Sequence, residues 1–252
     1  MLKIENLSLT FHKNQPDEKI AFKNLNLTAE KGEFIIVIGG NGAGKSTLMN
    51  LISGSILPDS GKIFVDTRDI TNLPEHKRAK FIGRVFQDPL KGTAPNLTIE
   101  ENLSLAMLRN SKRNLALGVS KQNSKFFKEK LSELNLGLED RLGTKMGLLS
   151  GGQRQAVTLL MATLVRPRIL LLDEHTAALD PKSCNKILEL TDKITKDKEI
   201  LTLMITHDME KSLNLGTRII KLEQGEVVMD LKNGKQEEIK SMSSKKNLIL
   251  TN

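Results

Sequence analysis

One glycine-rich stretch of the 252-residue sequence has the residue types and spacing needed to hold a chain of phosphates. Residues 39–47 read GGNGAGKST and fit the pattern G-x-x-x-x-G-K-[ST]. Glycines let successive backbone N–H groups face one concavity, and the start of a following helix adds positive potential there. Lys45 would supply a cation for the β- and γ-phosphates of a nucleotide, and Ser46 a hydroxyl ligand for Mg²⁺.

The alternative interpretation of this stretch is a glycine-rich turn that contains a lysine by chance. It is disfavoured because the pattern follows an apolar run typical of a strand and opens a helical pattern, as a phosphate loop requires. The predicted nucleotide-binding residues of the loop are Gly39, Asn41, Gly42, Ala43, Gly44, Lys45, Ser46 and Thr47.

A second stretch places two carboxylates where an apolar run stops. Residues 171–180 read LLDEHTAALD, and the apolar run ends at Asp173 and Glu174. A buried strand delivers such side chains to the carboxyl edge of an open α/β sheet, where ligands bind. Asp173 therefore fits a ligand of Mg²⁺, reached through a bound water, and Glu174 fits the group that orients or deprotonates the attacking water. A merely solvated acidic loop is disfavoured because the phosphate loop independently requires an acid.

The sequence LSGGQ at residues 149–153 adds a second candidate anion site. Ser150 suits the N-cap of the helix that follows, and Gly151 and Gly152 leave backbone amides exposed. Two phosphate-binding helix starts in one chain suggest that two surfaces enclose one ligand. The alternative is a capped helix start without a ligand.

Buried strands and short helices must position these groups. The continuous apolar run at residues 34–38, bounded by glycines, is typical of a strand buried on both faces of a parallel sheet. Patterning predicts strands over 4–11, 34–38, 62–66, 84–88, 168–174 and 200–208, helices over 45–53, 100–109, 121–134 and from LSGGQ to Pro167, and a hairpin over 218–231 with its turn at Gln224 and Gly225. This order predicts an α/β core with a helical insertion.

The composition is that of a soluble globular protein, with 38% hydrophobic and 27% charged residues. The apolar runs are far shorter than the roughly 20 residues that span a bilayer, and no secretory signal is visible. The single cysteine, Cys184, excludes an internal disulfide and fits a reducing cytosol. The formal charge of +8 is spread along the chain, and without Trp or Tyr a nucleic-acid stacking platform is disfavoured.

The motifs, in their order, make the sequence similar to the ATP-binding cassette (ABC) ATPases over nearly its whole length. The phosphate loop, LSGGQ and the strand that ends in LLLDE follow one another as in that family. Gln87 in VFQDP matches the Q-loop, residues 177–180 (AALD) match the D-loop, and His207 in MITHD matches the switch histidine. Five motifs in the family's order are more specific than any one of them.

The resemblance implies a fold and a domain plan. The expected fold is α/β, a P-loop NTPase core with a mostly parallel sheet, an N-terminal antiparallel β subdomain and an inserted helical subdomain. The expected plan is one ABC ATPase domain over residues 1–234, with the helical subdomain at about 91–165, and a polar tail over 235–252.

The resemblance also implies that two subunits pair head to tail. The phosphate loop of one subunit and the LSGGQ sequence of the other, called the signature in this family, would then enclose the same ATP and Mg²⁺. The implied nucleotide-binding residues are then also Phe11, Ser150, Gly151, Gly152, Gln153 and Asp180; the catalytic residues are Glu174, His207 and Gln87; the metal ligands are Ser46, Gln87 and Asp173. Gln87 and His207 could instead be ordinary polar residues at strand ends, but their family positions favour contacts with the γ-phosphate.

Phe11 lies where the family places the aromatic side chain that stacks on adenine. Because the chain has no Tyr or Trp, Phe11 or His12 would have to do the stacking. Phe11 also shares strand parity with Leu7 and Leu9, so a position in the core is an equal alternative.

Two features depart from the family's pattern. Most members read DEPT where this chain reads DEHT, and His175 cannot fix the turn as proline would. The helix after the signature reads RQAVTLLMATL, where the family has arginines and alanines. Both departures resemble a bacterial branch linked to uptake systems with a lipid-anchored binding protein, often for amino acids. His175 could tune Glu174 or contact the partner subunit, but the simpler interpretation is a tolerated branch difference.

The expected function is that of the nucleotide-binding subunit of a bacterial ABC transporter, which hydrolyses ATP to drive uptake of a small solute such as an amino acid. Expected partners are a second copy of the chain, transmembrane permease subunits that dock over about residues 87–148, and a lipid-anchored substrate-binding protein, with no nucleic acid. The permease would hold the subunit at the cytoplasmic face of the membrane.

Three alternatives remain. The first is a soluble ABC ATPase, such as an iron–sulfur assembly scaffold component of similar length. DNA-repair and translation members are disfavoured because they carry paired cassettes or large insertions. A catalytically inactive regulator is disfavoured because Lys45, Asp173, Glu174 and His207 are all present.

Overall fold

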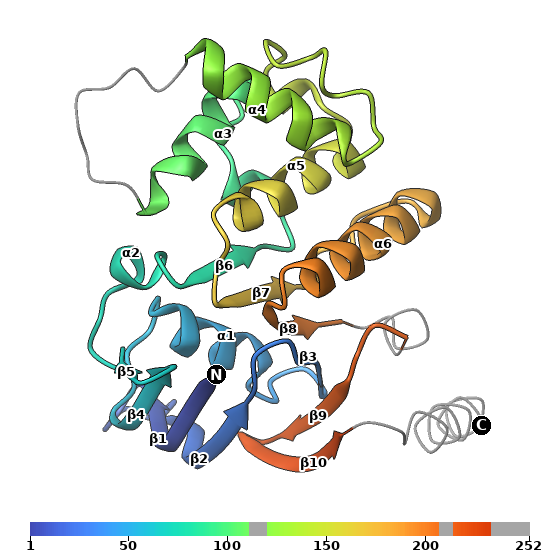
Figure 1. Ribbon diagram of the computed structural model, residues 1–252. Coiled ribbons are helices and arrows are strands. Elements are labelled where there is room, and N and C mark those ends of the chain that lie inside the picture. Colours follow the sequence, from blue (N-terminus) through green and yellow to red (C-terminus); the bar gives the residue numbers. More distant parts are fainter. Residues whose placement is uncertain (111–119, 207–213, 233–252) are drawn as a thin grey trace, which may run out of the picture.

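The computed structural model describes residues 1–110, 120–206 and 214–232, which form two β-sheets and a group of helices (Figure 1). One sheet is antiparallel, in the order β2-β1-β4-β5. Its strands are β1 (Leu2–Phe11), β2 (Lys19–Ala29), β4 (Ser60–Val65) and β5 (Arg68–Asp69). It confirms the expected N-terminal antiparallel β subdomain.

The second sheet is mostly parallel and has the order β10-β9-β3-β8-β7-β6. Its members are β3 (Phe34–Ile38), β6 (Ile82–Val85), β7 (Ile169–Asp173), β8 (Leu201–Ile205), β9 (Arg218–Glu223) and β10 (Glu226–Lys232). All neighbours from β9 to β6 pair in parallel, and only β10 runs antiparallel, against β9. The mostly parallel core predicted from the buried apolar runs is confirmed.

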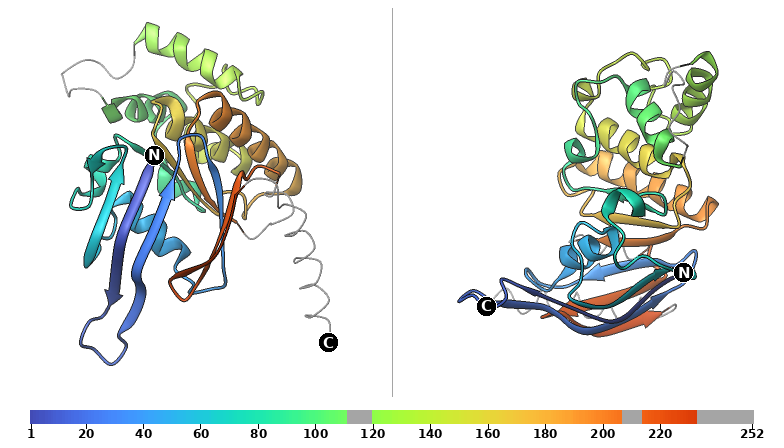
Figure 2. Two further views of the ribbon diagram at one scale, coloured as in Figure 1. Left: turned by 60° about the horizontal axis from the view of Figure 1, so that its bottom comes forward. Right: turned by 90° about the vertical axis from the view of Figure 1, so that its left-hand side faces the viewer.

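The strands of this sheet are buried on both faces because helices and the other sheet cover them. Along β3, Ile35 and Val37 belong to a core shared with α1 (Lys45–Ser53) and the antiparallel sheet. Ile36, on the opposite face, belongs to a core shared with α5 (Gly151–Leu164) and α6 (Pro181–Asp197). Figure 2 shows the resulting layers, with the helical part on the side of the sheet away from the antiparallel strands.

The inserted helical part is built from α3 (Ile99–Met107), α4 (Lys121–Ser132) and α5. A capping box fixes the start of α3, because Thr98 and Glu101 each accept a backbone N–H from the other. Shorter elements are α2 (Glu75–Arg78) and the 3₁₀ turns η1 (Pro89–Gly92), η2 (Leu108–Asn110) and η3 (Met146–Leu148). No helix in the described part of the chain is long and apolar enough to cross a membrane.

Most predicted elements are present, but one strand is shorter than predicted and four further helices and strands of the described chain were not predicted. The strand at 34–38, the helix at 45–53 and the hairpin turn at Gln224 and Gly225 are confirmed. The strand expected to reach the proline of VFQDP ends at Val85 instead, and Asp88 caps the 3₁₀ turn η1 by accepting the N–H of Leu90 at 2.9 Å. The strand β2 and the helix α6 were not predicted from the sequence, and neither were the short elements β5 and α2. Pro181 at the start of α6, directly after Asp180, was a usable signal for that helix.

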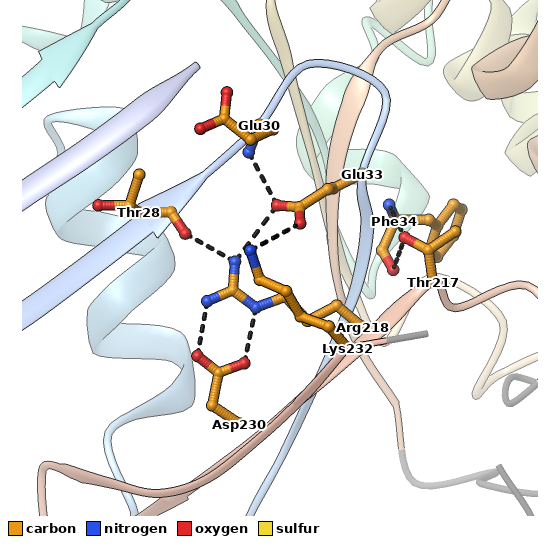
Figure 3. Close-up of polar contacts among 8 residues, drawn as sticks. All are labelled: Thr28, Glu30, Glu33, Phe34, Thr217, Arg218, Asp230 and Lys232. Atoms are coloured by element: carbon orange, nitrogen blue, oxygen red, sulfur yellow. Dashed lines mark hydrogen bonds and ion pairs between the residues drawn. The ribbon is translucent and has the colours of Figure 1, made fainter. Parts of the chain in front are cut away.

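A buried ionic cluster anchors the terminal hairpin of β9 and β10 to the rest of the fold (Figure 3). The guanidinium of Arg218, 5% exposed, donates to both oxygens of Asp230 at 2.7 and 2.6 Å. It also donates to the Thr28 carbonyl at 2.6 Å and to Glu33 at 3.2 Å. Because β2, the loop before β3 and the hairpin all meet at one side chain, their relative positions are fixed.

Candidate functional site

The phosphate loop connects β3 to α1, and two of its positions can hold only glycine. Gly39 has φ +155°, and a Cβ there would lie 2.3 Å from the carbonyl oxygen of Leu222. Gly44 has φ +103°, and a Cβ there would lie 2.9 Å from the ring of Phe22. The close approach of β9 and β2 therefore shapes the loop, and glycine is required for it.

Lys45 begins α1 and folds back over the loop. It is 8% exposed, and its Nζ donates to the carbonyls of Gly39 at 2.8 Å and Gly40 at 2.9 Å. Ser46 is exposed, and Thr47 is half-buried. Lys45 and Ser46 are thus the first two residues of α1, at the helix end where the dipole favours an anion.

The tip of the loop is partly open and partly supported by the terminal hairpin. Asn41 and Gly42 are exposed, whereas Ala43 is buried. The Ala43 carbonyl accepts the N–H of Gly225 at 3.2 Å, so the turn between β9 and β10 braces the loop. A Cβ at Gly225 would lie 2.0 Å from the carbonyl oxygen of Ala21, which shows how closely this turn packs against β2.

Asp173 ends β7 near the phosphate loop. Nη2 of Arg84 lies 3.5 Å from its Oδ2, and the two side chains are 12% and 18% exposed respectively. Burial raises the pKa of the Asp173 carboxyl, while the Arg84 guanidinium and the Lys45 ammonium oppose that rise and the charge of Glu174 adds to it. The predicted metal ligand and the phosphate-loop lysine are thus brought within electrostatic range of each other.

Glu174 follows in an uncommon backbone conformation. Its φ is +46°, in the left-handed region that costs a non-glycine residue about 1–2 kcal/mol. Its N–H donates to the carbonyl of Ile205 on β8 at 3.0 Å, which holds the residue at the strand end. Strained residues of this kind occur preferentially at functional sites, so the conformation agrees with the role predicted for Glu174.

The remaining candidates of the core sheet follow strands that end at the same edge. Gln87 is exposed and lies two residues beyond the end of β6. β8 ends at Ile205, and His207 lies outside the described residues. Because β3, β6, β7 and β8 are parallel, their carboxyl ends lie along one edge. The contacts predicted for Gln87 and His207 with the γ-phosphate stay predictions.

The signature motif opens α5, in the helical part of the chain. Ser150 is the N-cap, and its hydroxyl oxygen accepts the N–H of Gln153 at 3.3 Å while the Gln153 side chain accepts the N–H of Ser150. Gly151 is exposed. A Cβ at Gly152 would lie 2.7 Å from Oγ of Ser183, so this glycine permits α5 and α6 to approach each other. The predicted N-cap is confirmed, and its contact with a nucleotide stays a prediction.

The D-loop leads from β7 to α6. Asp180 is exposed and caps α6 by accepting the N–H of Ser183 at 3.0 Å. Hydrogen bonds from Ser183 hold the pKa of the Asp180 carboxyl below its ordinary value. Its side chain therefore has a structural task within its own chain, and its predicted contact with nucleotide stays a prediction.

Phe11 ends β1 and is half-buried against the core of the antiparallel sheet. The neighbouring His12 is exposed, has φ +51°, and contacts the carboxylate of Asp17 through Nδ1. The core covers the Phe11 ring only partly, so both alternatives for this residue, packing in the core and stacking on adenine, agree with its position.

His175 does not share the exposure of the acids before it. It is 2% exposed, and Nε2 lies 3.3 Å from Oγ1 of Thr191 on α6. Among the described residues its Nδ1 has no hydrogen-bond partner, and burial lowers the pKa of the imidazole to about 4. The histidine is therefore a neutral side chain between the strand end and α6, and its interpretation as a tolerated branch difference stays a prediction.

Two arginines near the site were not singled out from the sequence. Arg84 contacts Asp173, and the signal for it was a charge inside the apolar strand IGRVF. Arg154 donates to the carbonyls of Met146 and Leu149 at 3.1 and 3.0 Å, which fixes the approach to the signature. No sequence signal distinguished Arg154 from an exposed helix arginine.

A groove of about 460 Å³ lies beside β6, where the core sheet meets α3 and α5. Its walls come from β6, the segment after η1, α3 and α5, and they include Arg84, Lys91, Leu105, Thr158 and Met161. The lining contains arginine and lysine but no Asp or Glu. Part of its lining, from Lys91 to Arg109, belongs to the segment expected to receive the permease.

The sequence is similar to one family of known proteins, and the relatives with similar sequences are transport proteins of the same kind. The profile of the family described as "ABC transporter" matches residues 22–177, more than half of the chain. The tyrosine transport ATP-binding protein of Clostridioides difficile (strain R20291) is 47% identical over 239 residues, which cover 95% of each chain. The energy-coupling factor transporter ATP-binding protein EcfA2 of Clostridium tetani (strain Massachusetts / E88) is 33% identical over 91% of this chain and 78% of its own.

Solved structures support the same fold. The dimeric structure of a post-hydrolysis state of the ATP-binding cassette MJ0796, bound to ADP and Pi, superposes with a TM-score of 0.78 and is 32% identical. The match covers 92% of this chain and 98% of that one.

Proposed function

The chain belongs to the ABC transporter family, and from this premise we propose that it powers the uptake of a small solute of the amino-acid type. As a member it is a nucleotide-binding subunit and an ATP hydrolase. The observation that carries the proposal is the end-to-end similarity to a tyrosine transport ATP-binding protein. The relatives named here are transport proteins, so they give no support to a soluble iron–sulfur assembly component.

ATP would bind where the phosphate loop opens. Exposed amides of the loop and the Lys45 ammonium face the phosphates, and Phe11 or His12 covers the adenine. The required glycines at Gly39 and Gly44 support this role, because a loop with side chains there could not take the same path.

Mg²⁺ belongs to this proposal because the side chains at the edge suit a hard cation. Ser46 offers a hydroxyl, Gln87 an amide oxygen and Asp173 a carboxylate. Within the part of the chain that the structure describes, no group of three His, Cys, Asp or Glu side chains could hold a metal alone. Phosphate oxygens would therefore complete the ligand set, and the bound ion would neutralise charge on them.

Hydrolysis would depend on Glu174 as the residue that orients or deprotonates the attacking water. Its strained position at the strand end, held by Ile205, keeps the carboxylate next to Asp173. Gln87 and His207 would contact the γ-phosphate. A proton taken by Glu174 from the water leaves the oxygen free to attack the γ-phosphorus, the bond from that phosphorus to the bridging oxygen breaks, and ADP and phosphate are the products.

The complete site would need a second copy of the chain. Ser150, Gly151, Gly152 and Gln153 open α5 in the helical part, away from the phosphate loop on the sheet (Figure 1). Head-to-tail pairing would bring this signature, and Asp180 of the D-loop, to the nucleotide of the partner. The dimeric cassette structure supports pairing as a property of such chains.

Membrane attachment would come from permease subunits. The groove beside β6 supports a docking site of the right kind, because exposed Leu90, Leu105 and Leu108 lie on the elements around it. The subunit would then act at the cytoplasmic face of the membrane, with a lipid-anchored binding protein delivering solute on the other side.

The test is reconstitution with the permease encoded next to this gene. In liposomes that contain ATP on the subunit side, we expect accumulation of a labelled amino acid, with tyrosine tried first. Glu174→Gln should abolish accumulation while the complex still assembles. An active ATPase that drives no amino-acid uptake, or neighbouring genes for iron–sulfur assembly, would overturn the proposal.

A further inference from the structure

Arg84 is an unusual residue for its position. It lies on β6 opposite Leu171 of β7, in a strand whose neighbours Ile82 and Val85 are buried. Its side chain is only 12% exposed. A guanidinium held this far from water needs close polar partners, because an unpaired buried charge is costly.

Its partners come from the C-terminal end of α1 and from the end of β7. Nη1 donates to Oγ of Ser53, the last residue of α1, at 3.2 Å, and lies 3.5 Å from Oγ of Ser55. Nη2 approaches Oδ2 of Asp173 at 3.5 Å. The guanidinium also lies over the ring of Phe86, 4.6 Å from its centroid, on the segment that leads to Gln87.

These contacts connect α1 with the end of β7. They reach α1 at its last residue, Ser53, while Lys45 and Ser46 open the same helix, and the end of β7 carries Asp173. A planar guanidinium stacked on a ring has little freedom, so a group bonded to it is held in place. Lys45 also acts on the carboxylate, but its ammonium is engaged by the loop carbonyls of Gly39 and Gly40.

We propose that Arg84 is a positioning residue that fixes the Asp173 carboxylate relative to the phosphate-loop helix α1. The inference rests on the proposed place of Asp173 in the magnesium site. Arg84 also forms part of the groove wall. A segment seated in the groove therefore touches the Arg84 side chain. Docking would then act on the position of the Asp173 carboxylate through Arg84.

The test is a thermal double-mutant cycle on the isolated subunit without nucleotide. Arg84→Met should lower the melting temperature because it leaves the Asp173 carboxylate buried without its nearest cation. In the Asp173→Asn background that charge is gone, so the same substitution should cost at least about 3 °C less, a difference that corresponds to roughly 1 kcal/mol for a chain of this size. Equal losses in both backgrounds would overturn the proposal, since Arg84 would then act only through Ser53 and Phe86.

Steady-state ATP hydrolysis provides the second readout. Arg84→Met should lower kcat by about tenfold or more with KM within about twofold, because the phosphate loop is untouched while the carboxylate is displaced. Arg84→Lys, which retains the cation, should recover part of both losses. An unchanged kcat in Arg84→Met would also overturn the proposal.

A matched control is available in Arg68, whose guanidinium lies over the ring of Phe81 at 5.1 Å and, in the described part of the chain, forms no ion pair with a candidate site residue. Arg68→Met removes a stacked guanidinium and should leave kcat unchanged, with no coupling to Asp173→Asn. The thermal cycle needs neither ATP nor a permease. Its failure is therefore distinct from a failure of the transport proposal, which the liposome experiment measures.

Discussion

Glu174 and His175 are neighbours in the sequence, yet they serve different parts of the molecule. Glu174 is half-buried at the strand end in a left-handed conformation. His175 is buried against Thr191 of α6. The two neighbours therefore differ in burial, with Glu174 partly exposed at the strand end and His175 part of the interior.

Glu174→Gln should bind MgATP but hydrolyse it at least about a hundredfold more slowly, because the amide keeps the shape and lacks the base. Two subunits that cannot hydrolyse ATP should remain paired. Nucleotide affinity, ATPase rate and gel-filtration mass in MgATP measure the three effects. Turnover at the wild-type rate would show that Glu174 has no catalytic role.

His175→Pro should retain most ATPase activity, since the side chain lies against α6 and proline is the family's usual residue there. The substitution should also reduce the loss of unfolding free energy that occurs as the pH falls. The pKa of His175 falls from 6.5 to about 4 on folding. Below pH 6.5 the unfolded state therefore takes up a proton that the folded state does not, and the unfolding free energy decreases as the pH falls toward 4. Between pH 7 and pH 5 the wild type should lose about 2 kcal/mol more unfolding free energy than the variant.

Urea unfolding of both proteins at the two pH values measures this difference directly, and the other histidines cancel in the comparison. Parallel losses would mean that the His175 imidazole is not shielded as the structure has it. A collapse of hydrolysis with an intact fold would instead make His175 a working part of the site.

The terminal hairpin is the element whose importance for the site is least evident from its position in the chain. Its turn braces the phosphate loop through the Gly225 N–H and the Ala43 carbonyl. Its strands are tied to the core by Arg218 and Asp230. The predicted phosphate loop is therefore supported by a hairpin that lies about 180 residues later in the chain.

Asp230→Asn should lower the melting temperature by several degrees, because it removes a paired charge from a guanidinium that is 5% exposed. We expect a loss of about 2 kcal/mol in unfolding free energy, measured by urea titration. Lys232→Met is the matched control. Its ammonium lies 3.5 Å from Glu33 but is 58% exposed, so its loss should change stability by less than about 1 kcal/mol. Equal effects of the two substitutions would contradict the anchoring role of the Arg218 cluster.

At the scale of the whole molecule, one chain presents two separate surfaces suited to anions. The phosphate loop belongs to the core sheet, and the signature belongs to the helical part. A subunit alone would therefore use half of each site, and pairing would complete two.

Gly151→Asp tests which nucleotide the signature serves. The position tolerates a side chain, because a Cβ there would lie 3.5 Å from Cδ2 of Leu179 and no positive φ is required. The isolated variant should bind ATP within about twofold of wild type through Lys45 and Ser46, yet fail to dimerise or hydrolyse, since like charges would meet at the interface. A collapse of nucleotide affinity in the monomer would mean that Gly151 serves its own nucleotide.

Mixing provides the complementary measurement. Lys45→Ala should lose most ATP binding, because Lys45 is the side-chain cation within the phosphate loop. In a mixed dimer of Gly151→Asp and Lys45→Ala subunits, one site keeps both an intact loop and an intact signature. ATPase activity should reappear in the mixture and be absent from each variant alone.

Gly152→Asp is unsuitable for this purpose, because a Cβ there would lie 2.7 Å from Oγ of Ser183 and would disturb the packing of α5 on α6.

The sequence alone determined the features that depend on local order. Strand 34–38, helix 45–53 and the turn at Gln224 and Gly225 followed from apolar periodicity and glycine placement, and the structure confirms them. The parallel core was predictable because its strands are continuous apolar runs. The N-cap at Ser150 was predictable for the same kind of reason, since capping depends on residues three apart.

Only the tertiary structure decided how distant segments meet. The contact of Arg84 with Asp173, the burial of His175 against α6 and the Arg218 cluster each join residues from different elements. Short-range sequence patterns do not predict such contacts. The contacts depend on the strand order and on the packing of α1 and α6 against opposite faces of one sheet. Motif spacing could therefore indicate which residues act on phosphate, while the fold determined which side chains hold them in place.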